Sequence, residues 1–101
     1  MTDLLTSIAR SYDLPPPDVS FDGRQRIAVD LGELIILDDG RLAFRCRHAR
    51  GTALDISRLP GSTIISGRAG VEMVIAIDVA IIERVFTLAP PKQPRFRSIC
   101  K

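Results

Sequence analysis

The chain has 101 residues, of which 46% are apolar, and a formal net charge of +2. This length suits one domain with a single core, and so small a charge does not by itself indicate a nucleic-acid-binding protein. The apolar residues are mainly Leu, Ile and Val, with no Trp and one Tyr, so we expect an aliphatic core.

The sequence predicts neither a signal peptide nor a membrane span. Asp3 lies where a signal peptide has its basic region, and no long apolar run follows it. The longest apolar stretch, residues 71–88, contains four charged residues, which is too many for a membrane span. Cys46 and Cys100 show no disulfide-framework spacing, so we expect reduced thiols in a cytoplasmic protein.

The N-terminal residues predict a short amphipathic helix over residues 3–13. Four residues share one helical face: Leu4, Leu5, Ile8 and Tyr12. Thr2 or Asp3 can cap the start of the helix, and the prolines at 15–17 end it. A helix this short must dock on an apolar surface to be stable. Residues 18–23 are predicted to be a connector with a turn at Asp22-Gly23.

An antiparallel β-meander is predicted from residue 24 to residue 48, with turn signals at Gly32 and Gly40. In its first strand Ile27, Val29 and Leu31 share one face. The second strand, residues 34–37, is apolar on both faces. Either both faces are covered within the monomer, or one of them faces a partner.

The third strand alternates apolar and basic side chains. Its apolar face carries Leu42, Phe44 and Cys46. The opposite face, extended by one further arginine, forms a basic stripe: Arg41, Arg45, Arg47 and Arg50. The stripe is either a solvated sheet face or a surface for phosphate or an acidic peptide. It lacks interleaved aromatic residues, which disfavours single-stranded nucleic acid as the ligand.

The second half of the chain predicts a short helix, a hairpin and a C-terminal element. Residues 52–59 suit one or two helical turns, and residues 62–66 and 71–77 suit two strands joined by a loop at 67–70. Four residues of the return strand share a face: Val71, Met73, Ile75 and Ile77.

Asp78 can cap a helix over residues 79–89. Its inward-facing residues would be Val79, Ile82, Val85 and Phe86. The β-branched content also suits a longer strand, so the sequence leaves helix and strand open here. We therefore expect one α+β domain over residues 1–89, followed by a flexible, basic, Pro-rich tail over residues 90–101.

No group of residues in the sequence predicts catalysis. His48 is the only histidine; it shares a strand face with Cys46, but no third ligand or orienting acid accompanies the pair. Asp38 and Asp39 precede Gly40 and are read as turn residues. We therefore expect no enzyme activity, no metal and no cofactor.

The apolar side chains outnumber those that one small sheet and two short helices need. The excess indicates either a well-filled core or a surface for a dimer or a bound peptide. The candidate residues for such a surface are Leu34, Ile35, Ile36, Leu37, Leu42, Phe44, Ile56, Leu59, Ile64 and Ile65.

Taken together, these elements resemble the class I type III secretion chaperones of the Tir chaperone type. The shared order is an N-terminal helix, an antiparallel β-meander, a short middle helix, a β-hairpin and a C-terminal helix. The resemblance is carried by residues 1–48: the Leu-rich helix from Leu4 ending at Leu14-Pro15, then Phe21-Asp22, then the first apolar strands. Members of the family are usually longer and acidic, whereas this chain is short and slightly basic.

The resemblance implies a non-enzymatic homodimer that holds an extended segment of a secreted effector polypeptide, without a cofactor and without a membrane. Two other classes remain open on the residues alone. One is a nucleic-acid-binding or regulatory module that uses the basic stripe. The other is a structural subunit of a larger assembly, whose apolar faces would be permanent interfaces.

Overall fold

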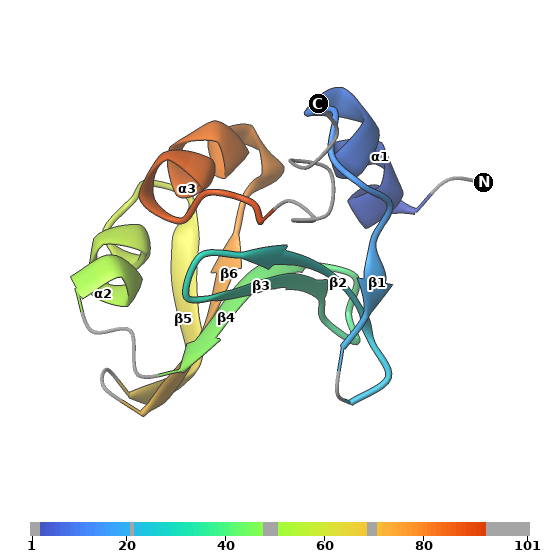
Figure 1. The fold of residues 1–101 in the computed structure, drawn as a ribbon. Helices are drawn as coiled ribbons and strands as arrows, with labels where there is room; N and C mark the ends of the chain where they lie inside the picture. Colours follow the sequence, from blue (N-terminus) through green and yellow to red (C-terminus); the bar gives the residue numbers. More distant parts are fainter. Residues whose placement is uncertain (1–2, 21, 48–50, 69–70, 93–101) are drawn as a thin grey trace.

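The computed structural model describes residues 3–20, 22–47, 51–68 and 71–92. Over these residues a six-stranded antiparallel sheet is covered on one face by three α-helices (Figure 1). The elements are α1 Leu4–Ser11, β1 Asp18–Val19, β2 Gln25–Val29, β3 Gly32–Ile36, β4 Leu42–Arg47, α2 Gly51–Ser57, β5 Ser62–Arg68, β6 Glu72–Ile77, the 3₁₀ turn η1 Val79–Ile81 and α3 Ile82–Leu88. The strand order is β1-β2-β3-β4-β6-β5. The predicted α+β layout is confirmed.

Helix α1 forms as the N-terminal pattern predicts. The Asp3 side chain accepts a hydrogen bond from the Thr6 amide at 2.8 Å, and this bond lowers the pKa of the Asp3 carboxyl. Leu5 and Ile8 are buried against the sheet. The helix ends where Asp13 adopts a left-handed φ of +57°, two residues before the first proline.

The meander forms as predicted, except that one residue, Leu31, does not face the core. Directly paired residues of antiparallel strands point to the same side, and Leu34 lies opposite Phe44 in the layer that packs on the helices. Leu31 was predicted to share the buried face of the first strand. Instead it occupies the β2–β3 turn with φ +70° and is 47% exposed. The predicted connector over residues 18–23 also contains a two-residue strand, β1, which pairs with β2.

The middle helix and the hairpin are confirmed as α2, β5 and β6. Met73, Ile75 and Ile77 face the core, but Val71 lies in the turn and is exposed. The register of β5 on β6 shifts between Ile64 and Ser66.

The C-terminal element is helical and not a longer strand. The Asp78 carboxylate accepts a hydrogen bond from the Ala80 amide at 3.0 Å and starts a 3₁₀ turn, which α3 then continues. Because a 3₁₀ turn has fewer residues per turn than an α-helix, it changes which of residues 79–81 face the core. Val79 therefore points to solvent, against the prediction, and Ile81 takes its place in the core.

The predicted tail begins inside the folded part of the chain. Residues 90–92 run beside β2, with an antiparallel bridge between Pro91 and Val29. The described fold therefore extends past residue 89, and the rest of the predicted tail, residues 93–101, lies outside the described residues. In the described part of the chain, no helix has the length and apolar character needed to cross a bilayer.

Candidate polypeptide-binding edges of the sheet

The two outer edges of the sheet differ: β5 forms one, and the two-residue strand β1 with the end of β2 that β1 does not cover forms the other. Strand β5 has seven residues and, in the part of the chain that the structure describes, pairs only with β6. Its outer backbone groups therefore face away from the sheet without a ladder partner there. An edge of this length is a template for pairing with another chain.

Exposed apolar side chains surround this edge. Ile64 is 50% exposed and Ile65 is 40% exposed. Leu54 on α2, which contacts β5, is exposed as well. The register shift at Ile65 leaves one extra residue in β5, a β-bulge that bends and twists the strand. Apolar side chains and unpaired backbone groups therefore occur together along β5.

Most of the other candidate residues belong to the core of the chain itself. Five of the predicted partner-facing residues are at most 3% exposed: Leu34, Ile35, Leu42, Phe44 and Ile56. Their predicted role in binding is corrected, because these side chains are already packed within the monomer. Ile36, Leu37 and Leu59 are half-buried. Of the ten candidates, Ile64 and Ile65 are the exposed ones.

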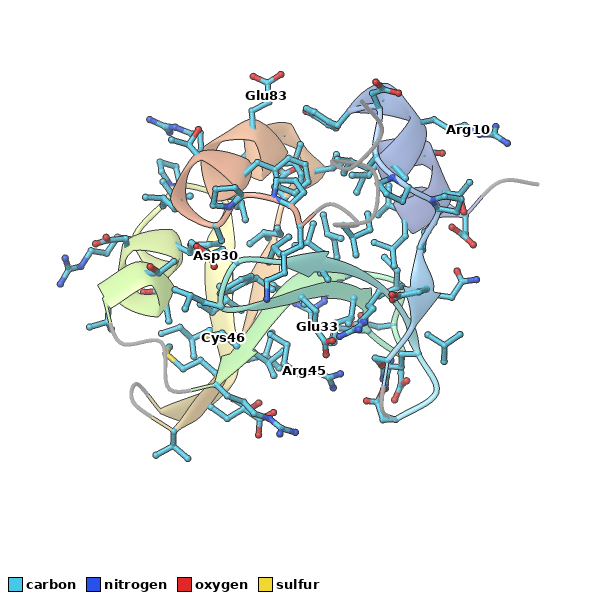
Figure 2. All side chains as sticks on the ribbon, viewed as in Figure 1. Arg10, Asp30, Glu33, Arg45, Cys46 and Glu83 are labelled. Carbon is cyan, nitrogen blue, oxygen red and sulfur yellow. The ribbon has the colours of Figure 1, made fainter. Side chains whose placement is uncertain are left out.

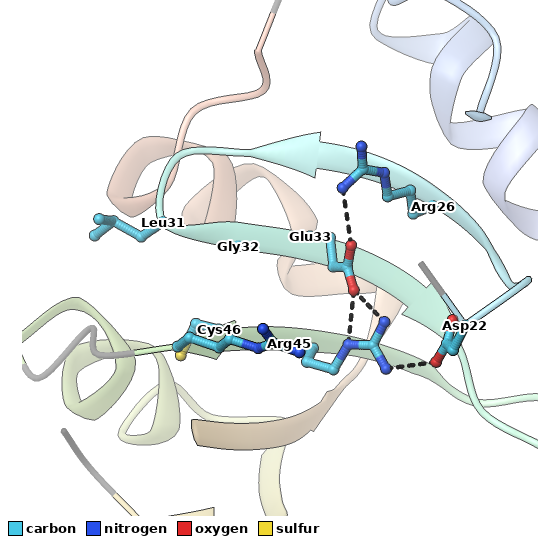
Figure 3. Close-up of a pocket in the computed structure, with 8 residues that line it drawn as sticks. Asp22, Arg26, Leu31, Gly32, Glu33, Arg45 and Cys46 are labelled. Atoms are coloured by element: carbon cyan, nitrogen blue, oxygen red, sulfur yellow. Dashed lines mark hydrogen bonds and ion pairs between the residues drawn. The ribbon is translucent and has the colours of Figure 1, made fainter. Parts of the chain in front are cut away.

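Two arginines of the basic stripe, Arg41 and Arg45, form ion pairs with carboxylates. Figure 2 shows Glu33 and Arg45 on the sheet face opposite the helices. Arg45 Nε donates to Glu33 Oε2 at 2.6 Å, and Arg45 Nη1 donates to Asp22 Oδ2 at 2.8 Å (Figure 3). Arg41 pairs with Asp39 at 2.8 Å. Arg47 is exposed, and Arg50 lies outside the described residues.

The network extends across four strands. Glu33 also accepts from Arg26 Nη1 at 3.2 Å, and Arg26 Nε donates to Asp18 on β1 at 2.8 Å. The Arg45 guanidinium and the Ser20 hydroxyl hold the pKa of the Asp22 carboxyl well below its usual range. The pKa of Arg45 is raised in turn, mainly by its hydrogen bond to Asp22 and less by its hydrogen bond to Glu33. Arg26 lies directly opposite Ile35 in the β2–β3 register, and the alkyl stem of an arginine can cover such an apolar neighbour on a face without helices.

An open pocket of about 500 Å³ adjoins this network. Its lining residues are Asp22, Arg26, Leu31, Gly32, Glu33, Arg45, Cys46 and Arg47. The guanidinium groups of Arg26 and Arg45 already have carboxylate partners, whereas Arg47 at the pocket wall is exposed. Burial raises the pKa of the Cys46 thiol, which disfavours the reactive thiolate.

Of the predicted Cys46–His48 pair, the structure describes Cys46, whereas His48 lies outside the described residues. Among those that are described, no three His, Cys, Asp or Glu side chains come together as a metal site.

Sequence reasoning missed Glu33, Asp22 and Arg26 as members of the network. The available sequence signal was the turn at Asp38-Asp39-Gly40. In the structure Leu37 N donates to Arg41 O at 2.8 Å and closes the β3–β4 hairpin around this turn. Counting back along both strands from this closure places Glu33 opposite Arg45, as the register has it.

The outer edge of β2, by contrast, is covered. Strand β1 pairs with the first two residues of β2, and residues 90–92 lie beside the end of β2.

Comparison with known proteins found no similar protein: no protein-family model matches the chain, and no match was found among the curated proteins or the solved structures.

Proposed function

We propose that this protein is a non-enzymatic, chaperone-like homodimer that holds an extended segment of a type III secreted effector. The observation that supports this proposal is the difference between the two sheet edges. One edge, β5, is long, open and flanked by exposed apolar side chains. At the opposite end of the sheet, β2 is covered by two short segments of the chain, β1 and residues 90–92.

Backbone pairing at an open edge supplies the contacts for such a dimer. Two copies of β5 that pair across a two-fold axis would join their sheets and cover Ile64 and Ile65 of both copies. The order of elements, helix–meander–helix–hairpin–helix, is also that of the family which the N-terminal residues resemble. The effector segment then binds at surfaces that the dimer leaves free.

A lysine at position 64 of the β5 edge should separate the dimer. In Ile64→Lys the charge would have to be buried between two copies, which is costly without a partner. Static light scattering at micromolar concentration should give a dimer mass for the wild type and a monomer mass for the variant. The control is Leu31→Lys, because Leu31 is similarly exposed but lies in the β2–β3 turn. A monomeric wild type would contradict the proposed dimer.

Binding of the effector segment should survive moderate salt. Exposed ion pairs contribute about 0.2–1 kcal/mol each, whereas burying one leucine-sized side chain contributes about 1.5–3 kcal/mol. Arg41 and Arg45 are already paired with carboxylates, so two arginines of the basic stripe have less charge to offer a ligand. Apolar contacts should therefore dominate the affinity.

The test begins with the polypeptide that copurifies with the tagged protein from its native host. A synthetic peptide covering its bound segment is titrated at low and at high salt. Retained affinity supports the proposal. A steep loss of affinity with salt, together with competition by a polynucleotide, would instead favour a nucleic-acid-binding module.

A further inference from the structure

The edge of β2 is occupied by residues 90–92, which we call the strap. The Asp30 amide donates to Pro90 O at 2.8 Å, and the Lys92 amide donates to Ala28 O at 2.9 Å. Pro91 lies opposite Val29 between these two bonds. After α3 the chain therefore returns to the sheet and lies alongside β2 (Figure 1).

In the part of the chain that the structure describes, the strap is held to β2 by these two backbone hydrogen bonds. Pro90 and Lys92 are exposed, and Pro91 is half-buried. The buried anchor is Ala89, which precedes the strap and is 0% exposed. The strap can therefore leave β2 without uncovering the side chains of the core.

The strap also prevents further strands from adding at this edge. In an antiparallel ladder, a residue between two hydrogen-bonded neighbours directs its own backbone groups to the other side. Pro91 is in this position, and proline has no amide proton. A strand outside the strap would find no donor there. A polypeptide can therefore pair with β2 at this position only where the strap has left.

A second open pocket, of about 230 Å³, lies beside the strap. Its walls include Leu14, Pro15, Ile27 and Lys92 of the strap itself. Because Lys92 forms part of the wall, departure of the strap would widen this pocket next to the freed backbone of β2. A strand that binds there can place an apolar side chain in it.

We propose that the strap is an internal competitor, which occupies the β2 edge until an extended segment of a partner polypeptide replaces it. The partner segment donates an amide to Ala28 O, accepts from the Asp30 amide and places an apolar side chain beside Leu14. This inference rests on the proposed function, because it assumes that the protein binds extended polypeptides. The strap thereby keeps the edge closed while no partner is present.

The test compares two substitutions at one position in the full chain. Lys92→Pro removes the amide that bonds Ala28 O, while the backbone of the preceding proline already suits a following proline. Lys92→Ala removes the same side chain but keeps the amide. The probe is a short synthetic peptide of alternating valine and threonine with lysine at both ends, a composition that favours strands.

Lys92→Pro should bind this peptide about 2-fold to 10-fold more tightly than the wild type, the range that one net hydrogen bond provides. Lys92→Ala should bind as the wild type does. In the wild type, bound peptide should accelerate hydrogen exchange at the Lys92 amide, which loses its acceptor. The Asp30 amide should remain protected, because a peptide carbonyl replaces Pro90 O.

Other outcomes overturn the inference in distinguishable ways. Equal affinity of all three proteins, or peptide binding without faster exchange at Lys92, would show that the peptide binds elsewhere; the strap would then not be a competitor, while polypeptide binding would stand. Slower exchange along β5 on binding would identify that edge as the place of binding. If none of the three proteins binds the peptide, the proposed function and this inference fail together.

Discussion

Replacing Phe44 with alanine should lower the free energy of unfolding by about 3–5 kcal/mol. Phe44 is 0% exposed and lies between Leu34 on β3 and Ile75 on β6 in the layer under the helices. The substitution removes a large apolar side chain and leaves a cavity that rigid strands on both sides cannot close. Urea denaturation at fixed protein concentration measures the loss.

Two further variants keep this experiment interpretable. Phe44→Leu retains more of the volume and should show a smaller loss, so a value can be obtained even if the alanine variant does not fold. Val19→Ala is the surface control, because Val19 is 66% exposed and such changes stay within about 0.5 kcal/mol. A similar small effect at Phe44 would contradict its central place in the core.

Replacing Glu33 with glutamine should cost about 2 kcal/mol of stability. Removing one partner of a fully buried ion pair costs about 3–5 kcal/mol, and here the side chains of Glu33 and Arg45 are 13% and 20% exposed, so solvent offsets part of this. The variant leaves two guanidinium groups, those of Arg26 and Arg45, without their shared carboxylate.

The matched control for this prediction is Asp39→Asn. Its ion pair with Arg41 has the same chemistry, but both side chains are more than half exposed, so a loss of at most about 1 kcal/mol is expected. Arg45→Met added to Glu33→Gln should cost less than the sum of the two single changes, because both single variants break the same Glu33–Arg45 pair. Equal effects at Glu33 and Asp39 would show that burial does not strengthen the network.

The sequence predicted elements well where hydrophobic spacing and a capping residue agree. Asp3 and Asp78 both cap the turns that they were expected to start. The errors occur at turns. The pattern gave Gly32 as the turn residue, but the positive φ belongs to Leu31. Gly32 lies in β3, where a Cβ would collide with the backbone oxygen of Arg45.

The candidate site was less predictable because it depends on which strands become neighbours. Alternation along one strand correctly separated Arg45 from Phe44, but it contains no information about Glu33 on the facing strand. The same limit applies to the apolar residues. Spacing cannot tell Ile56, which the core buries, from Ile64, which lies on an edge strand; that difference follows from the placement of β6 between β4 and β5.

This strand order has a consequence for synthesis of the chain on the ribosome. β4 ends at residue 47, and its permanent neighbour β6 begins only at residue 72. Until β6 emerges, β4 has one open side, and Phe44 lacks its contact with the strand that carries Ile75. Non-local pairing of this kind is slow and leaves intermediates prone to association. The nascent chain therefore passes through an aggregation-prone interval, which ends only when the β5–β6 hairpin docks on β4.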